Sequence, residues 1–197
     1  VVGMGGVFFM NAVRIVCCGL VAATLLAASA GVWAQIDDRT LVLDNGRDGP
    51  LSLPLTQLVE QYQLQTLTVD DIHHKAMHTY LGIDLKALLT SAGFRPGAQL
   101  LLVGADGSSL AFDSNVLLAN QWQGLIALRD QAATGDDYFV PLEQGGESVD
   151  FGPFYLVWAP IAGSASTSIT GTSTASASEL PWSRGLTQIK LLQPSGL

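Results

Sequence analysis

The sequence predicts an α+β fold, a strand-rich mixed sheet with a few short helices. Short apolar runs and apolar–polar alternations, which are typical of strands, recur across residues 40–192. Only two or three segments place apolar residues at the spacing of one helical face. Clusters of Gly, Pro, Asn and Asp separate these segments, as expected for turns.

The first half of this region contains most of the predicted elements. Expected strands cover residues 41–43, 51–53, 66–69, 99–103 and 110–112. A helix is expected from Pro54, because proline lacks the N–H that the first helical turn leaves unpaired. A second helix follows Asp84, a good N-cap residue, and ends before Gly93, which suits the left-handed position after a helix.

In the second half, Ser114 is expected to cap a short helix over residues 116–118, and Gly145-Gly146 to form a hairpin turn. Further strands are expected at residues 125–128, 154–158 and 186–192. Residues 163–178 consist almost entirely of Ser, Thr, Ala and Gly, and such a segment buries too little apolar surface to order itself. We therefore expect a flexible Ser/Thr-rich loop at residues 163–179 inside one domain.

The N-terminal segment resembles an export signal. Arg14 precedes an apolar run from Ile15 to about Leu26, and small residues lead to Ala34, which is the order of a signal peptide. We expect residues 1–34 to be a signal peptide cleaved after Ala34, residues 35–197 to be a single domain, and the protein to be periplasmic or secreted. The alternative is an uncleaved N-terminal membrane anchor, since a span needs about 20 apolar residues.

Charge and cysteine content restrict the possible partners and chemistry. Residues 35–197 contain all 17 acidic residues and eight basic ones, a net charge of −9. Such an acidic domain has no electrostatic reason to bind nucleic acid. Both cysteines, Cys17 and Cys18, lie in the predicted leader. The predicted mature chain therefore has no disulfide and no thiolate to serve as nucleophile or metal ligand.

All three histidines of the chain lie in the segment His73-His74-Lys75-Ala76-Met77-His78. On a helix, His74 and His78 would share a face with β-carbons about 6 Å apart, close enough to bind one metal ion. On a strand they would lie about 13 Å apart, which excludes a shared ion. We expect His73 and His74 in a polar loop and a partly buried His78 on a strand, and assign no metal site.

The order of several segments resembles the sulfite-oxidase-like molybdopterin-binding domain family. The segments that carry the resemblance are His78-Thr79-Tyr80-Leu81-Gly82-Ile83-Asp84-Leu85-Lys86-Ala87-Leu88-Leu89, Ala92-Gly93, Asp106-Gly107, Leu117-Leu118-Ala119, Gly152-Pro153-Phe154-Tyr155-Leu156-Val157, and Trp182 with Leu186-Thr187-Gln188-Ile189. The resemblance covers roughly residues 40–193 and implies a strand at residues 76–81. It also implies an often exported oxidoreductase domain that holds a molybdenum–molybdopterin cofactor. Catalytic members bind molybdenum through a cysteine thiolate, and no position of the mature chain matches that ligand.

Two functions follow as expectations, and whether the protein is an enzyme stays open. The first is a redox subunit that holds a molybdenum–pterin and works with a membrane redox partner. The second is a cofactor-less periplasmic ligand-binding or sensing module, which binds a small anion or contacts a membrane sensor. In either case His74, His78 and Arg129 are the candidate contacts for the cofactor or anion, because imidazole and guanidinium groups donate hydrogen bonds to anions.

Overall fold

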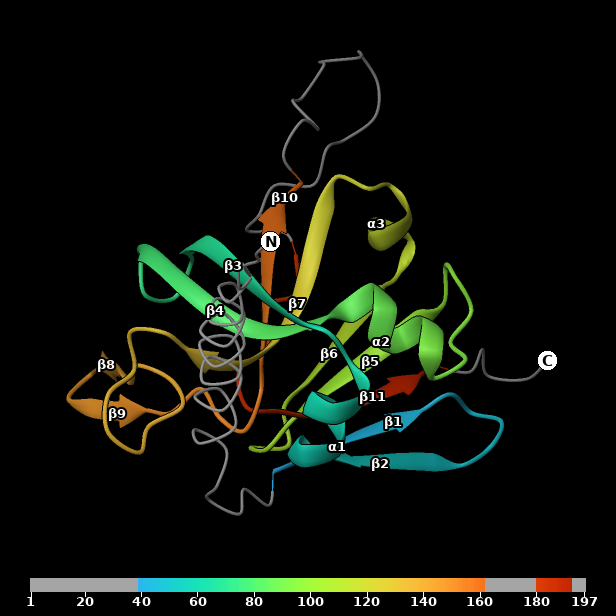
Figure 1. Ribbon diagram of the computed structural model, residues 1–197, viewed down its shortest axis with the longest axis horizontal. Coiled ribbons are helices and arrows are strands. Elements are labelled where there is room, and N and C mark those ends of the chain that lie inside the picture. Colours follow the sequence, from blue (N-terminus) through green and yellow to red (C-terminus); the bar gives the residue numbers. More distant parts are fainter. Residues whose placement is uncertain (1–38, 162–179, 193–197) are drawn as a thin grey trace, which may run out of the picture. The chain divides into compact units, whose positions relative to one another are not determined.

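Two β-sheets organise the described part of the chain, residues 39–161 and 180–192 of a computed structural model (Figure 1). The predicted leader at residues 1–34 and the whole of the predicted Ser/Thr-rich loop at residues 163–179 lie outside the described residues. The described residues belong to one compact unit. Among the described residues, no helix is long and apolar enough to cross a membrane.

The first sheet is mixed and has the strand order β2-β1-β11-β5-β6. Its strands are β1 (Thr40–Asp44), β2 (Pro50–Pro54), β5 (Gln99–Gly104), β6 (Ser109–Asp113) and β11 (Leu186–Leu191). β1 and β11, the first and last described strands, pair in parallel, and the other neighbours are antiparallel. The sheet therefore consists of two hairpins, β1–β2 and β5–β6, which the last strand joins.

The second sheet is antiparallel and has the order β10-β7-β4-β3. Its strands are β3 (Leu64–Asp71), β4 (Ala76–Asp84), β7 (Trp122–Asp130) and β10 (Tyr155–Pro160). The register between β4 and β7 shifts so that Leu128 has no partner on β4. Arg39 reaches this bulge and donates to the Leu128 carbonyl oxygen at 3.0 Å and to the Pro153 carbonyl oxygen at 2.8 Å. A third, two-stranded sheet pairs β8 (Leu142–Gln144) with β9 (Glu147–Val149) across the predicted Gly145-Gly146 turn.

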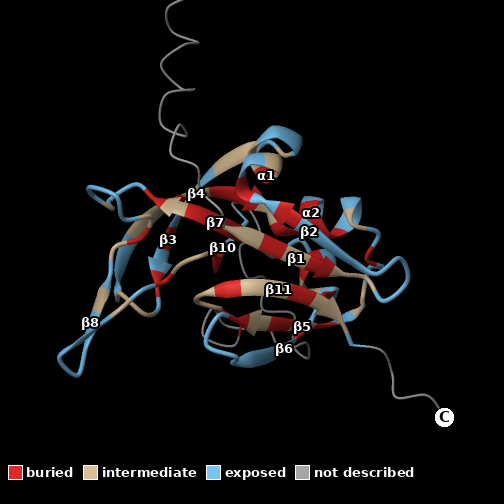
Figure 2. Cartoon of the chain, turned by 90° about the horizontal axis from the view of Figure 1, so that it is seen from below, coloured by how far each residue is buried: buried red, intermediate tan, exposed pale blue. Residues whose placement is uncertain are grey.

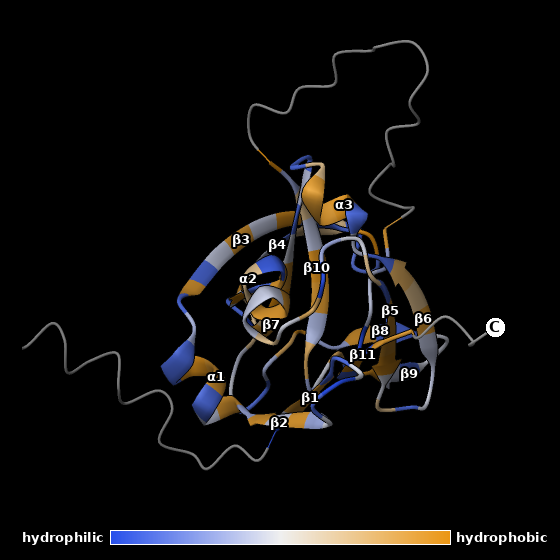
Figure 3. Ribbon diagram, turned by 90° about the vertical axis from the view of Figure 1, so that its right-hand side faces the viewer, coloured by the Kyte–Doolittle hydropathy of each residue, from blue (hydrophilic) through white to orange (hydrophobic). Residues whose placement is uncertain are grey.

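Three short helices join the strands: α1 (Leu55–Gln61), α2 (Leu85–Ser91) and α3 (Asn115–Leu118). The cap of α2 is confirmed, because the Asp84 side chain accepts from the Ala87 amide at 2.8 Å. Gly93 follows α2 with φ +76°, as predicted. The Ser114 cap is wrong: its side chain makes no capping hydrogen bond and its hydroxyl is buried without a partner. In Figure 3, α1 and α2 carry both apolar and polar residues, as helices with one buried face do.

The core lies where the two main sheets face each other. Strands β7 and β10 are buried over most of their length, whereas β6 is an exposed edge (Figure 2). The Phe112 ring of β6 lies 5.4 Å from the Trp158 ring of β10, so the sheets share one apolar interior. The predicted strand-rich α+β class with a mixed sheet and few short helices is therefore confirmed.

Candidate functional site

The histidines lie at and beside the turn between β3 and β4. This turn is folded around the side chain of Asp71, the last residue of β3. One carboxylate oxygen of Asp71 accepts from the amides of His73 at 2.7 Å and His74 at 3.0 Å. Lys75 completes the turn with φ +54°. The local geometry is that of an Asx turn, in which a short acidic side chain replaces backbone hydrogen bonding.

Asp71 is fully buried, and its second oxygen is also occupied. It accepts from the hydroxyls of Tyr80 at 2.7 Å and Tyr155 at 2.9 Å. Burial alone would raise the pKa of Asp71, but these hydrogen bonds together hold that pKa below its usual value. Burial, with the neighbouring carboxylate, raises the pKa of both tyrosines far above the normal range. The hydroxyls therefore remain protonated donors to an ionised carboxylate.

His78 lies on β4, as predicted, and is held by a second buried carboxylate. Its Nδ1 lies 2.6 Å from Oδ2 of Asp130, a residue with no exposed surface at the end of β7. The other oxygen of Asp130 accepts from the Ala132 amide at 2.9 Å. Because a carboxylate is an acceptor, Nδ1 carries a proton, and in that tautomer of the uncharged ring the lone pair is on Nε2.

His74 lies against His78, with ring centroids 4.3 Å apart. The separation of about 13 Å applies only when both residues are on one strand. It does not apply to this pair, because His74 belongs to the turn, as predicted, and only His78 lies on β4. The loop position predicted for His73 and His74 is confirmed. Burial is the main cause that lowers the pKa of His73 and of His74, so both imidazoles are neutral near pH 7.

Aromatic rings enclose this histidine cluster, defined as His73, His74 and His78. The Phe151 ring lies 4.6 Å from the His74 ring and 5.9 Å from the His73 ring. The Nε2 of His73 is buried without a hydrogen-bond partner among the described residues.

Arg129 does not join the histidine cluster. In the pairing of β4 with β7, Asp130 is opposite Tyr80 and Arg129 is opposite Leu81. Successive residues of a strand point to opposite faces of a sheet. Arg129 therefore lies on the opposite face of the second sheet from Asp130. Of the three predicted contacts, the structure brings together only His74 and His78.

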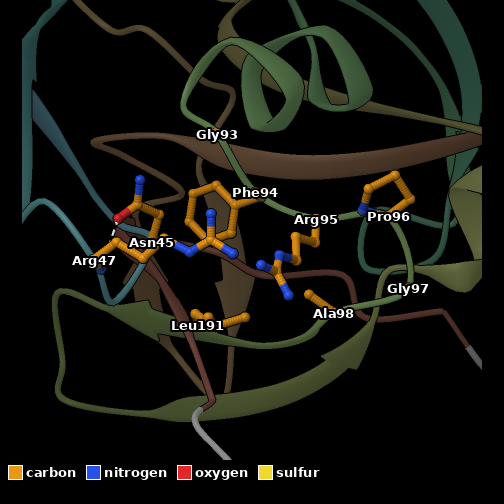
Figure 4. Close-up of a pocket in the computed structure, with 9 residues that line it drawn as sticks. All are labelled: Asn45, Arg47, Gly93, Phe94, Arg95, Pro96, Gly97, Ala98 and Leu191. Atoms are coloured by element: carbon orange, nitrogen blue, oxygen red, sulfur yellow. Dashed lines mark hydrogen bonds between the residues drawn. The ribbon is translucent and has the colours of Figure 1, made fainter.

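A separate pocket of about 220 Å³ lies between the β1–β2 turn and the loop that follows α2 (Figure 4). Its lining residues are Asn45, Arg47, Gly93, Phe94, Arg95, Pro96, Gly97, Ala98 and Leu191. Asn45 ties the two walls together: its Oδ1 accepts from the Arg47 amide at 2.9 Å, and its Nδ2 donates to the Ala92 carbonyl at 3.0 Å. This cross-link fixes the distance between the two loops.

Two arginines dominate the electrostatics of this pocket. In Figure 4 the side chains of Arg47 and Arg95 extend toward one another from opposite walls. Both are exposed, and neither guanidinium forms an ion pair or hydrogen bond with a described residue. The nearby Asp48 carboxylate accepts instead from Asn45 Nδ2 at 3.2 Å. The pocket therefore offers two positively charged forks with unused donors.

The pairing of Arg47 with Arg95 was not predicted from the sequence. A local signal does exist, because each arginine lies in a short segment bounded by glycines, Gly46-Arg47-Asp48-Gly49 and Gly93-Phe94-Arg95-Pro96-Gly97. Gly93 and Gly97 have φ values of +76° and +77°, which favour glycine. Two glycine-bounded arginines indicate tight turns that present a guanidinium, but they do not indicate that the turns meet.

No protein-family model matches this chain, and no curated protein matches it. Whether this chain could hold a molybdenum cofactor must therefore be judged from its own residues. The described residues include no cysteine, since Cys17 and Cys18 lie outside them, and they contain no group of three or more His, Cys, Asp or Glu side chains placed around one metal position. This donor set does not fit a molybdenum ion bound through a thiolate.

Proposed function

We propose that this protein is an exported ligand-binding module of the cofactor-independent kind, whose ligand is a small anion held between Arg47 and Arg95. One observation carries the proposal. In a domain with a net charge of −9, two unpaired guanidinium groups extend toward one another across a pocket of about 220 Å³. Export rests on the predicted leader, and a sensing role would follow from coupling such binding to a membrane partner.

An anion between the arginines makes use of both. Each guanidinium presents parallel N–H donors that match two oxygens of a carboxylate, phosphate or sulfate. A hydrogen bond to a charged group contributes about 1.5–3 kcal/mol, so two arginines on one anion give useful affinity even at an exposed site. Without an anion, the two like charges repel across the pocket.

The volume and the lining residues of the pocket restrict the class of ligand that it can bind. Pockets that enclose drug-sized molecules usually measure about 300–1,000 Å³, and this one is smaller. The buried Phe94 and the side chain of Leu191 provide apolar surface beside the arginines. We therefore expect a small organic acid or phosphate ester, not a complete pterin cofactor.

A second pocket of about 50 Å³ shares the lining residues Phe94, Arg95 and Pro96 with the first. Its lining includes Phe94, Arg95, Pro96 and Ser114. Ser114 is 6% exposed, and its hydroxyl has no hydrogen-bond partner among the described residues. Because buried hydroxyls are normally paired, this group suits a polar atom of a ligand that reaches past Pro96.

The test is a binding titration on the untagged chain that follows Ala34. Isothermal titration with phosphate, sulfate, succinate and citrate should reveal saturable binding that weakens as salt is added. Arg47→Ala and Arg95→Ala should each weaken the best ligand by about tenfold or more, since each removes charge-assisted hydrogen bonds of about 1.5–3 kcal/mol. Arg129→Ala is the matched control, because it removes the same charge from the other sheet.

Two results would overturn this function. Equal losses in Arg129→Ala and Arg47→Ala would show a general charge effect instead of a site. Elemental analysis of protein purified from a molybdenum-competent host addresses the redox subunit that the family resemblance implies. About one molybdenum and one pterin per chain would replace the binding module with that redox subunit.

A further inference from the structure

We propose that His74 and His78 form a two-imidazole site for a divalent transition-metal ion of the zinc, copper or nickel type. This site is distinct from the Arg47–Arg95 pocket and uses none of its residues. Its ligands are the lone pairs of two imidazoles from one hairpin, and its remaining coordination positions are open to water or to a further ligand.

The placement of the rings supports a shared ion. Their centroids are 4.3 Å apart with an interplanar angle of 56°. Imidazoles that ligate one ion do so at about 2.0–2.1 Å from nitrogen to metal, so the two rings must be close neighbours, as they are here. The Asx turn at Asp71 holds this placement, because the same carboxylate fixes the amides of His73 and His74.

The carboxylate behind His78 also supports metal binding. Metal-bound histidines usually donate their other ring N–H to a carboxylate or carbonyl, which fixes the tautomer and turns the free nitrogen toward the metal. Asp130 is placed for that role, 2.6 Å from Nδ1 of His78, and the Ala132 amide donates to Asp130 in turn. Nε2 of His78 is the nitrogen left for a metal, on a side chain that is 12% exposed.

The tautomer that Asp130 selects at His78 suits a metal ion better than an anion. A lone pair on Nε2 accepts hydrogen bonds and does not donate them, so His78 in this tautomer is a poor contact for an anion. Imidazole donors suit zinc, copper and nickel, whereas calcium and magnesium require oxygen donors.

The protein supplies two ligands and leaves the others open. Within the described ranges, no third His, Cys, Asp or Glu joins the pair around one position. Structural zinc sites are closed by four protein ligands, whereas open sites keep positions for water or substrate. The proposed site is thus of the open, exchangeable kind.

The test uses untagged protein, since a histidine tag would mask the signal. Isothermal titration with zinc, copper and nickel chlorides should show one ion per chain, and calcium chloride should show none. His74→Gln and His78→Gln should each weaken binding by more than tenfold. Asp130→Asn should weaken binding by about 10–100-fold, the usual effect of removing an outer carboxylate partner. His73→Gln is the matched control and should bind as the wild type does.

A spectroscopic readout separates ligation from general stability. The Cu²⁺ complex should show electron paramagnetic resonance couplings from two nitrogen ligands, reduced to one in His74→Gln. His74 lies on the turn, and its backbone bond to Asp71 does not depend on its side chain, so His74→Gln should fold; circular dichroism checks this. Wild-type affinity in folded His74→Gln, or an equal loss in His73→Gln, would overturn the proposal. The outcome at Arg47 and Arg95 is independent of this one.

Discussion

Replacing Asp71 by alanine removes the acceptor of four hydrogen bonds at once. The amides of His73 and His74 lie in a surface turn, where water can replace the lost carboxylate. The hydroxyls of Tyr80 and Tyr155 cannot be rescued in this way, because these tyrosines are 1% and 0% exposed. The alanine variant therefore leaves two buried hydroxyl donors without an acceptor.

The expected destabilisation follows from those two hydroxyls and from the shape of the turn. A buried polar group left without a partner costs about 1–3 kcal/mol, so Asp71→Ala should lower the free energy of unfolding by about 3–5 kcal/mol. Asp71→Asn should cost only about 1–2 kcal/mol, since its amide still accepts from the turn and can donate to the hydroxyl oxygens. Tyr155→Phe in the alanine background should restore about 1–3 kcal/mol, because it removes one stranded hydroxyl.

Urea unfolding followed by far-ultraviolet circular dichroism measures these free energies, with an unchanged m-value as the control for two-state behaviour. A loss below about 1 kcal/mol in Asp71→Ala would show that the carboxylate network contributes little. A further loss on adding Tyr155→Phe, in place of a recovery, would refute the argument from stranded hydroxyls.

Two other predictions concern pH and packing. Because the folded pKa of His73 and of His74 lies below the ordinary value of 6.5, the unfolded chain binds protons more strongly. Their contribution to the free energy of unfolding should be fully present above pH 6.5 and should be lost as the pH falls below that value. A pH series of thermal melts measures this decline, which should be smaller in the double variant His73→Gln/His74→Gln. Gly82→Ala should cost about 3 kcal/mol or more, since a β-carbon there would lie 2.2 Å from the Ile126 carbonyl oxygen. Gly107→Ala, which meets nothing within 4 Å but has φ +79°, should cost only about 1–2 kcal/mol; similar losses at both glycines in urea titrations would contradict the packing argument.

Elements with local signals were predictable from the sequence. The helix α2 is bounded by a capping carboxylate and a glycine in the left-handed region, and both signals lie within a few residues of the helix. The β8–β9 hairpin follows from Gly145-Gly146 in the same way. The Ser114 cap failed because a serine side chain caps only when it points back to the helix amides, and here the hydroxyl is directed into a buried position.

The two candidate sites depend on contacts between distant residues, which no local pattern contains. His74 meets His78 because the turn closes around Asp71, and the tyrosine that anchors this carboxylate from β10 lies 84 residues away. Arg47 and Arg95 meet because β1 and β5 are held by β11 between them. The sequence could name Arg129 as a possible anion contact, but its face of the sheet is set by the register with β4.

The parallel pairing of β1 with β11 also bears on how the chain is made. As the protein emerges from the ribosome, the β1–β2 and β5–β6 hairpins can each form as soon as both of their strands are synthesised. They stay separate until residues 186–191 follow, because only β11 joins them. A nascent chain shorter than this has two additional open strand edges, on β1 and β5, and open edges favour association with other chains. The first sheet is therefore complete only once the last described strand has been synthesised, whereas all strands of the second sheet are available by residue 160.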